Sequence, residues 1–321
     1  MAKRRNVLVA LLLCVYFFFA PFCVQALSTS NVEEPIILNE ECTLTLAYSL
    51  GGDTYSDVSA KLYKIADISS EITYSLTPKF ASTNLIINGI KTQSEWNVIC
   101  STLEAYILAD KISADFTKTT NSDGVVCFDN LSSGLYLVIT DEIVVDNTTV
   151  CFNSSLISLP NIDNNRNWEY NVTASPKGEL IPPTDPDEKT EFKVIKLWND
   201  DNNQDKRPNS IEIEIFKNGT SYKTVTLSNE NQWSHSWSDN SSGAKWTVIE
   251  RNKPDGYTMT VEQRDNTIIL TNIFIEDTPP STPETGDTSN TMLYAIIMII
   301  SGSLLIIMGI IGKRNVNEET E

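Results

Sequence analysis

The stretch Phe192-Lys-Val-Ile-Lys-Leu-Trp198 alternates in the manner of a β-strand. Successive side chains of a strand point to opposite faces of a sheet, so Val194, Lys196 and Trp198 share one face. Two later stretches give similar rows, namely Trp246, Val248 and Glu250 in the first and Ile268, Leu270 and Asn272 in the second. Each row is apolar except for one residue. The sequence therefore predicts a β structure that buries a lysine, a glutamate and an asparagine together.

Short strand patterns follow one another through the segment 190–275. They cover residues 192–198, 211–217, 222–227, 232–237, 246–250, 257–262 and 267–273. Between the second and the third, Asn218 and Gly219 supply the positive φ that a two-residue hairpin turn requires. So many short strands in one segment predict a small β-sandwich domain over residues 190–275.

The three inward polar residues indicate a reaction within the chain. Burial disfavours charge, so it lowers the pKa of Lys196 and raises the pKa of Glu250. A neutral amine can attack the side-chain amide of Asn272, while protonated Glu250 polarises the amide carbonyl and shuttles protons as ammonia leaves. The product is an isopeptide bond between Lys196 and Asn272. The alternative is an ordinary buried ion pair of Lys196 and Glu250 that Asn272 caps.

Several motifs of this segment resemble those of the Cna B-type domain. They are Val194-Ile-Lys-Leu-Trp-Asn-Asp-Asp, Lys206-Arg-Pro-Asn-Ser-Ile, Asn231-Gln-Trp, Trp246-Thr-Val-Ile-Glu with Pro254-Asp-Gly-Tyr257, and Leu270-Thr-Asn272. The resemblance implies the fold of that family and its self-made cross-link, in which Lys196 and Asn272 are joined and Glu250 is the catalyst. Trp246 stands where the family usually has tyrosine.

A second β domain is predicted over residues 41–177, with strand patterns at 58–65 and 151–159. One segment of it differs. Thr92 and Glu95 have the spacing of a capping box, and the apolar residues that follow recur at helical spacing as far as Asp110. We therefore expect one helix laid on the sheet.

The segment 124–138 of this domain is interpreted as two strands joined by a tight glycine turn. It resembles the hairpin G-x-V-x-F-x-x-L-x-x-G-x-Y-x-V of prealbumin-like Cna B-type and pilin N-terminal domains. The resemblance implies a mainly β chain with two prealbumin-like or Ig-like sandwiches in tandem. The opening strand, residues 42–48, holds no lysine, so we expect no isopeptide bond of the usual kind in this domain.

All the cysteines outside the first 26 residues lie in this first domain, at Cys42, Cys100, Cys127 and Cys151. Outside the cell an even number of cysteines makes disulfides possible, with three connectivities that the sequence does not rank. Free buried thiols are the alternative. The spacing of these cysteines fits no metal site, and we expect neither a metal nor a cofactor.

The N-terminal end carries an export signal. Lys3, Arg4 and Arg5 precede a long apolar run, which predicts a signal peptide over residues 1–26, and an extended leader follows at 27–40.

The C-terminal end has a stalk at 276–290, an apolar run at 291–312 that is long enough to cross a membrane, and a cytoplasmic tail at 313–321. The stalk contains Thr282-Pro-Glu-Thr-Gly286, which resembles the sorting signal Leu-Pro-x-Thr-Gly of Gram-positive surface proteins with threonine in place of leucine. The resemblance implies that a sortase cuts between Thr285 and Gly286 and joins Thr285 to a cell-wall amine. The alternative is a plain single-pass membrane anchor with a proline-rich stalk.

Residues 168–177 resemble the pilin motif W-x-x-x-V-x-V-Y-P-K, in which the lysine accepts the acyl-threonine of the next subunit. Ala174 and Ser175 replace the valine and tyrosine of that motif, and the other positions match. The resemblance makes Lys177 a candidate pilin acceptor. The alternative is a linker lysine, because a proline-rich linker at 178–189 follows and spaces the two domains.

Composition narrows the function. A net charge of −18 excludes nucleic acid as a partner, and a single histidine, His235, without a recognisable catalytic frame argues against an enzyme. We expect a Gram-positive, cell-wall-anchored structural protein, either a pilus subunit or an adhesive stalk, whose partners are sortase and a peptidoglycan precursor or other pilin subunits. The alternative is a monomeric wall-anchored adhesin that binds a host or matrix ligand. An ectoenzyme and a non-bacterial single-pass receptor are further alternatives.

Overall fold

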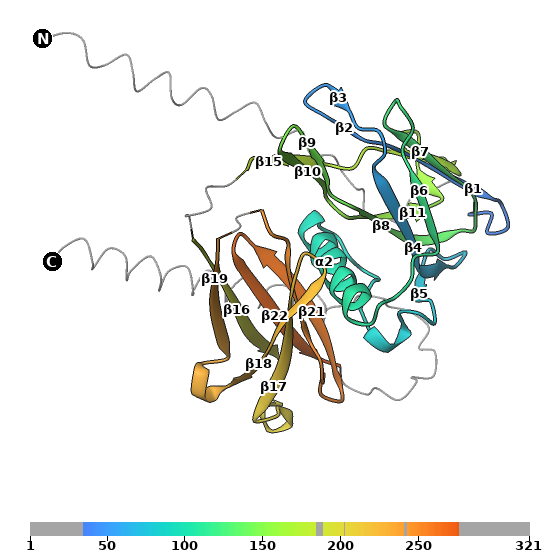
Figure 1. The fold of residues 1–321 in the computed structure, drawn as a ribbon. Helices are drawn as coiled ribbons and strands as arrows, with labels where there is room; N and C mark the ends of the chain where they lie inside the picture. The colour runs from blue at the N-terminus through green and yellow to red at the C-terminus, as the bar shows by residue number, and fades with distance from the viewer. Residues whose placement is uncertain (1–34, 184–188, 202, 241–242, 276–321) are drawn as a thin grey trace, which may run out of the picture.

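The computed structural model describes residues 35–183, 189–201, 203–240 and 243–275. The chain is mainly β, as predicted, with two groups of strands and one long helix, α2 (Gln93–Ala109), between them (Figure 1). None of the helices in the described ranges combines the length and the hydropathy needed to cross a membrane. The predicted signal peptide, sorting pentapeptide and transmembrane segment lie outside these ranges.

The C-terminal β unit contains all seven predicted strands. They are β16 (Thr190–Asn199), β17 (Ser210–Lys217), β18 (Thr220–Ser228), β19 (Ser234–Asp239), β20 (Trp246–Glu250), β21 (Tyr257–Arg264) and β22 (Thr267–Phe274). One sheet has the order β19-β16-β22-β21 and the other has the order β18-β17-β20. The predicted turn between β17 and β18 is confirmed, with positive φ at both Asn218 and Gly219. The predicted two-sheet sandwich is therefore confirmed.

The N-terminal β unit is built from more and shorter strands. They are β1 (Cys42–Ala47), β2 (Ser49–Leu50), β3 (Asp53–Thr54), β4 (Ser59–Ile68), β5 (Tyr74–Leu76), β6 (Phe116–Thr119), β7 (Val125–Leu131), β8 (Gly134–Thr140), β9 (Ile143–Val145), β10 (Thr148–Phe152), β11 (Ser155–Leu159), β12 (Asn161–Ile162), β13 (Trp168–Glu169), β14 (Asn171–Ala174) and β15 (Gly178–Ile181). The three main sheets have the orders β14-β1-β7, β11-β8-β4-β5 with β6 also on β4, and β15-β10-β9. Strand β15 occupies the first residues of the segment that we expected to be a linker.

The predicted hairpin over residues 124–138 is wrong in its pairing. Both strands exist, but β7 pairs with β1, whereas β8 pairs with β4 and β11. The chain therefore crosses from one sheet to another between β7 and β8. Strand β8 is buried on both faces, with Tyr136 in one hydrophobic cluster and Leu137 in another. Gly134 allows the crossing, because a Cβ there would lie 2.5 Å from the carbonyl oxygen of Ala66.

Helix α2 starts where the capping box predicts. The hydroxyl of Thr92 accepts from the backbone N–H of Glu95 at 3.2 Å, and the carboxylate of Glu95 accepts from the backbone N–H of Thr92 at 2.8 Å. Ile99, Leu103 and Ile107 pack into a core cluster of the N-terminal unit, as expected for a helix laid on its sheet. Helix α2 also packs against the C-terminal unit, which we did not predict from the sequence.

Candidate functional site

The three predicted polar residues meet inside the C-terminal sandwich. Lys196 on β16 and Asn272 on β22 come from neighbouring strands that run in parallel, and Glu250 comes from β20 in the other sheet. In the parallel register Lys196 lies opposite Leu270, two residues before Asn272, so both polar side chains fall on the inward face. The alternation of the three strands thus brings the three polar side chains together between the sheets.

The contacts among these residues are direct. The Lys196 Nζ lies 3.5 Å from Glu250 Oε2, and the Nδ2 of Asn272 donates a hydrogen bond to Glu250 Oε1 at 3.2 Å. The side chains of Lys196 and Glu250 have an exposed fraction of 0%, and Asn272 as a whole residue is also 0% exposed. Amine, carboxyl and amide therefore share one dry site.

Burial sets the charge state of the pair. It lowers the pKa of Lys196, against the attraction of Glu250, and the charge of Arg207 lowers it further. Burial likewise raises the pKa of Glu250, against the positive charges of Lys196 and Lys253. Both shifts favour a neutral amine beside a neutral carboxylic acid, which is the pair of states that nucleophilic attack on an amide requires.

Two buried oxygens of the site form no hydrogen bond with any described residue. Asn272 Oδ1 is one of them, and the other, Glu250 Oε2, has only the 3.5 Å ion-pair contact with Lys196. A buried polar atom without a partner costs free energy, so this arrangement is costly as a purely structural feature. Because Glu250 contacts the amide nitrogen of Asn272, the geometry matches the expected proton transfer to the leaving ammonia more directly than the expected polarisation of the carbonyl.

Aromatic side chains enclose the amine. Nζ of Lys196 lies 4.3 Å from the ring centre of Trp198 and donates to the backbone carbonyl of Leu197 at 3.1 Å. The Trp198 ring makes edge contacts with the rings of Trp233 and Tyr257. These rings help to exclude water from the site.

A second polar group, which we did not predict from the sequence, supports this enclosure. The buried carboxylate of Asp200 accepts from Arg207 Nε at 2.5 Å, from Arg207 Nη2 at 2.7 Å and from the hydroxyl of Tyr257 at 3.2 Å. Both Asp200 and Arg207 lie within the quoted motifs, but a buried carboxylate directly after a strand looks like an ordinary turn aspartate in the sequence.

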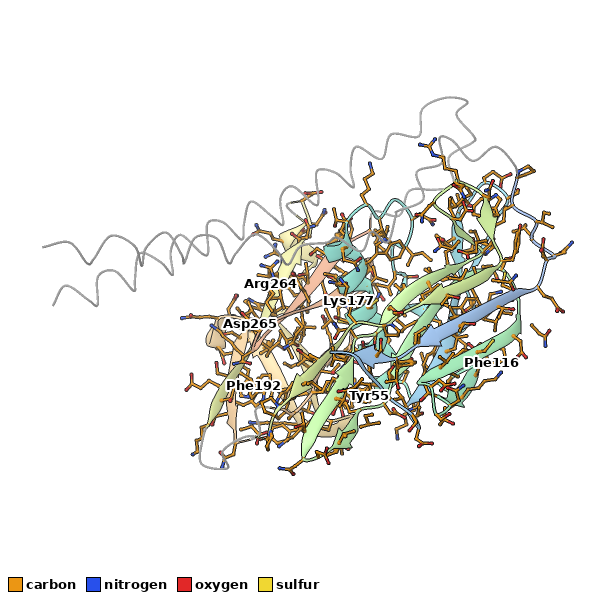
Figure 2. All side chains as sticks on the ribbon, turned by 90° about the horizontal axis from the view of Figure 1, so that it is seen from above. Tyr55, Phe116, Lys177, Phe192, Arg264 and Asp265 are labelled. Atoms are coloured by element: carbon orange, nitrogen blue, oxygen red, sulfur yellow. The ribbon has the colours of Figure 1, made fainter. Side chains whose placement is uncertain are left out.

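The other predicted site residues lie apart from this site. Lys177 is exposed after β14, and Figure 2 labels it. His235 stacks on Trp237 in β19. Thr285 and Gly286 are outside the described residues. Lys193 is exposed on the opposite face of β16, as expected.

The four cysteines are free thiols in the structure. Cys42 is buried in the core cluster that contains β1, Cys100 is buried in the cluster around α2, and Cys127 is exposed. Their placement on different elements, in separate clusters or at the surface, matches the alternative of unpaired thiols, and the possible disulfides have no counterpart here.

Comparison with known proteins gives a family match in the C-terminal unit. The model of the Cna protein B-type domain matches residues 192–273. A collagen adhesin of Staphylococcus aureus is 34% identical over 145 residues, which are 40% of this chain and only 12% of the length of that protein.

Solved structures of two kinds are similar to the chain. A single B repeat unit of the Staphylococcus aureus collagen-binding surface protein matches with 20% identity and a TM-score of 0.26, covering 74% of this chain and 98% of the repeat. The major pilin SpaA of Corynebacterium diphtheriae matches with 16% identity and a TM-score of 0.27, covering 77% of this chain and 66% of the pilin. The segment that matches the family model, residues 192–273, contains Lys196, Glu250 and Asn272, and it is called the B-type domain below.

Proposed function

We propose that this chain is a sortase-anchored structural protein of a Gram-positive cell surface, a pilus subunit or an adhesive stalk, whose B-type domain closes itself with a covalent bond between Lys196 and Asn272. The observation that carries the proposal is the dry contact of Lys196, Glu250 and Asn272 within a B-type domain. The chain turns over no substrate. Its own chemistry is a single bond-forming event.

The reaction follows from the contacts. The lone pair of the neutral Lys196 Nζ attacks the Cγ of Asn272, and the bond between Cγ and Nδ2 breaks. Glu250 relays one proton from Nζ to the departing Nδ2, so that one ammonia leaves and Glu250 regains its starting state. The hydrogen bond between Nδ2 and Glu250 Oε1 already places the acid beside the leaving nitrogen.

The bond explains how such a domain serves as a stalk. Lys196 lies on the first strand of the domain and Asn272 on the last, and the two strands are direct neighbours. A force that pulls on the two ends of the domain would pass through the cross-link and leave the strands between these residues unloaded. A domain closed in this way resists extension without needing a large core.

Assembly rests on two further features. Thr285 and Gly286 are the proposed sortase cleavage site, and exposed Lys177 is the proposed acceptor for the next subunit. The Lys177 side chain is exposed and forms no ion pair with any described residue, so its amine is accessible to an acyl group held by sortase.

A monomeric wall-anchored adhesin for a host or matrix ligand is the second candidate. The observation in its favour is the similarity to a protein named a collagen adhesin. In this case Lys177 is a linker residue and the protein is anchored singly.

An immunoblot of enzymatically released cell wall on a denaturing gel separates the two candidates. A ladder of high-mass species in the wild type that disappears in Lys177→Ala supports a polymerised pilin. The control is Lys193→Ala, which removes another exposed lysine and should leave the ladder intact. One wall-linked band in all three proteins supports the adhesin, and a protein released without wall treatment contradicts both candidates.

A further inference from the structure

Helix α2 is a structural part of the B-type domain, although it belongs to the N-terminal unit in sequence. Ala105 is fully buried in the core cluster of the B-type domain, and Tyr106, Leu108 and Ala109 pack against the same cluster. The helix therefore has two buried faces, and it lies against β21 in the ribbon view (Figure 1).

Polar contacts fix the helix on this surface. The hydroxyl of Thr102 accepts a hydrogen bond from the backbone N–H of Val261 at 2.8 Å, and both groups are buried. Glu104 forms an ion pair with Lys245 at 2.6 Å. At the end of the helix, Arg251 donates to the carbonyl of Ala109 at 3.3 Å.

Helix α2 covers the neighbouring edges of the two sheets of the B-type domain. Strand β21 is an edge strand of one sheet and β20 is an edge strand of the other, and α2 contacts both. Thr102 satisfies an N–H on the first edge, and Arg251 follows directly after the last residue of the second edge. An open edge presents unpaired backbone groups to water, and the helix covers them here.

The covered edge is the one that supplies Glu250. Glu250 is the last residue of β20, and its neighbour Arg251 is held by the end of α2. Tyr106 of α2 packs against the core cluster that includes Val248 and Ile249 of the same strand. The helix thus covers the strand that carries the acid.

We propose that α2 is a positioning element of the bond-forming site, so that the cross-link in the B-type domain forms efficiently only after the N-terminal unit has folded and docked. This inference rests on the proposed isopeptide bond. Its physical basis is the protonation of Glu250: water at the β20 edge would stabilise the ionised carboxylate, which has no proton to deliver to the leaving nitrogen. Docking of α2 keeps the edge dry and thereby makes the covalent closure the last step of maturation.

The test measures the rate of bond formation in the full chain after cell-free expression in the presence of detergent micelles. Samples are quenched in acidic denaturant, and the fraction of the cross-linked peptide that contains Lys196 and Asn272 is measured against time. Ala105→Glu places a charge in the buried contact and should slow the reaction roughly tenfold or more, as expected when the neutral form of one reacting group falls tenfold for each pKa unit. Asn97→Glu adds the same charge on an exposed position of the same helix and should leave the rate unchanged.

A second variant separates positioning from folding. Thr102→Val keeps the shape of the side chain but removes the acceptor for Val261 N–H, so it loosens the contact without a buried charge. The high-pH limit of the reaction, where Glu250 loses its proton, should move to lower pH in this variant. A folding defect alone would lower the rate by the same factor at every pH.

The outcomes are distinct. A wild type that never forms the cross-linked peptide refutes the proposed bond itself. The role of α2 is refuted if the wild type and both variants, Ala105→Glu and Thr102→Val, form the peptide at the same rate and with the same pH profile. In that case, rapid exchange of Val261 N–H with solvent in the variants shows that the helix contact was in fact loosened. A slower reaction and a shifted high-pH limit support it.

Discussion

In each β unit an early strand pairs in parallel with a late one, β1 with β14 and β16 with β22. The inward side chains of β1 are Cys42, Leu44 and Leu46, and Leu44 lies opposite buried Val172 of β14. The corresponding strands of the B-type domain carry Lys196 and Asn272. The two units thus share a way of closing the chain and differ in what lies at the closure.

The difference indicates that the parallel pairing of an early strand with a late strand is not sufficient for the proposed cross-link. A parallel pairing of two apolar rows is held by packing, and its strength depends on the area removed from water. The same pairing with a buried lysine, asparagine and facing glutamate is costly until the three groups react, because buried charges and unpaired polar atoms destabilise the fold. In the proposed account, the reaction removes this cost and gives the B-type domain a covalent bond.

The largest expected effect on stability comes from Glu250→Ala, which should leave both β units without a covalent cross-link. Without the acid the bond does not form, and the domain loses a closed loop that stabilises it by about 4 to 5 kcal/mol in the chain-entropy model. Buried Lys196 is then left unreacted and without the carboxyl group of Glu250 beside it. Denaturant unfolding, followed by the fluorescence of the B-type domain tryptophans, measures the change.

The control for this variant is Glu191→Ala, an exposed position on β16, which should change the free energy of unfolding by no more than about 0.5 kcal/mol. Equal losses in the two variants would mean that Glu250 has no special role in stability.

A matched pair of core truncations sharpens the comparison. Leu44→Ala in β1 and Leu270→Ala in β22 each remove a fully buried leucine and should each cost about 2 to 5 kcal/mol. Only the second lies in a domain with the proposed cross-link, so the Leu44→Ala protein should lose its N-terminal unit at lower denaturant. Hydrogen exchange of the β1 and β22 amides reports the order, and earlier loss of protection in β22 would contradict the account.

The polar support beside the site gives a smaller, pH-dependent effect. The hydrogen bonds from Arg207 lower the pKa of Asp200, so this stabilisation is present above the unfolded pKa of aspartate, about 4, and is lost as the pH falls through the lower folded pKa. Asp200→Asn should therefore cost about 1.5 to 3 kcal/mol at neutral pH. Chemical denaturation at neutral pH and at about pH 2 measures this, since wild type and variant should converge in acid. A constant difference would contradict the assignment.

The smallest expected effect lies in the N-terminal unit. Thr92→Ala removes the capping box of α2 and should lower stability by about 1 kcal/mol, whereas Thr117→Ala on an exposed strand position should have little effect. Thermal unfolding of the full ectodomain measures both. A loss confined to the B-type domain would contradict the local origin of the effect.

The sequence was sufficient to predict the sandwich fold of the B-type domain and its buried polar residues because the alternation of its strands is regular. Each strand presents one clear inward row, so the polar residues at 196, 250 and 272 stand out against apolar neighbours. The capping box of α2 was equally clear, since it depends only on residues three apart. Features that depend on local periodicity and local hydrogen bonds can thus be predicted from the sequence.

Features that depend on contacts between distant parts of the chain could not be predicted from the sequence. The segment 124–138 looks like a hairpin because both strands are apolar, but β8 is covered on both faces and therefore pairs elsewhere. The contact of Thr102 with Val261 joins residues far apart in the sequence, and neither residue has an unusual neighbourhood. The role of Asp200 was hidden for the same reason.

The most direct test of the central claim is the intact mass of the segment 27–285 under denaturing conditions, compared between the wild type and Glu250→Ala. The account predicts a wild type that is lighter than its sequence mass by one ammonia and a variant that has its full sequence mass. A wild type at its full sequence mass would mean that Lys196 and Glu250 form an ordinary buried ion pair and that the B-type domain is closed by packing alone, as the N-terminal unit is.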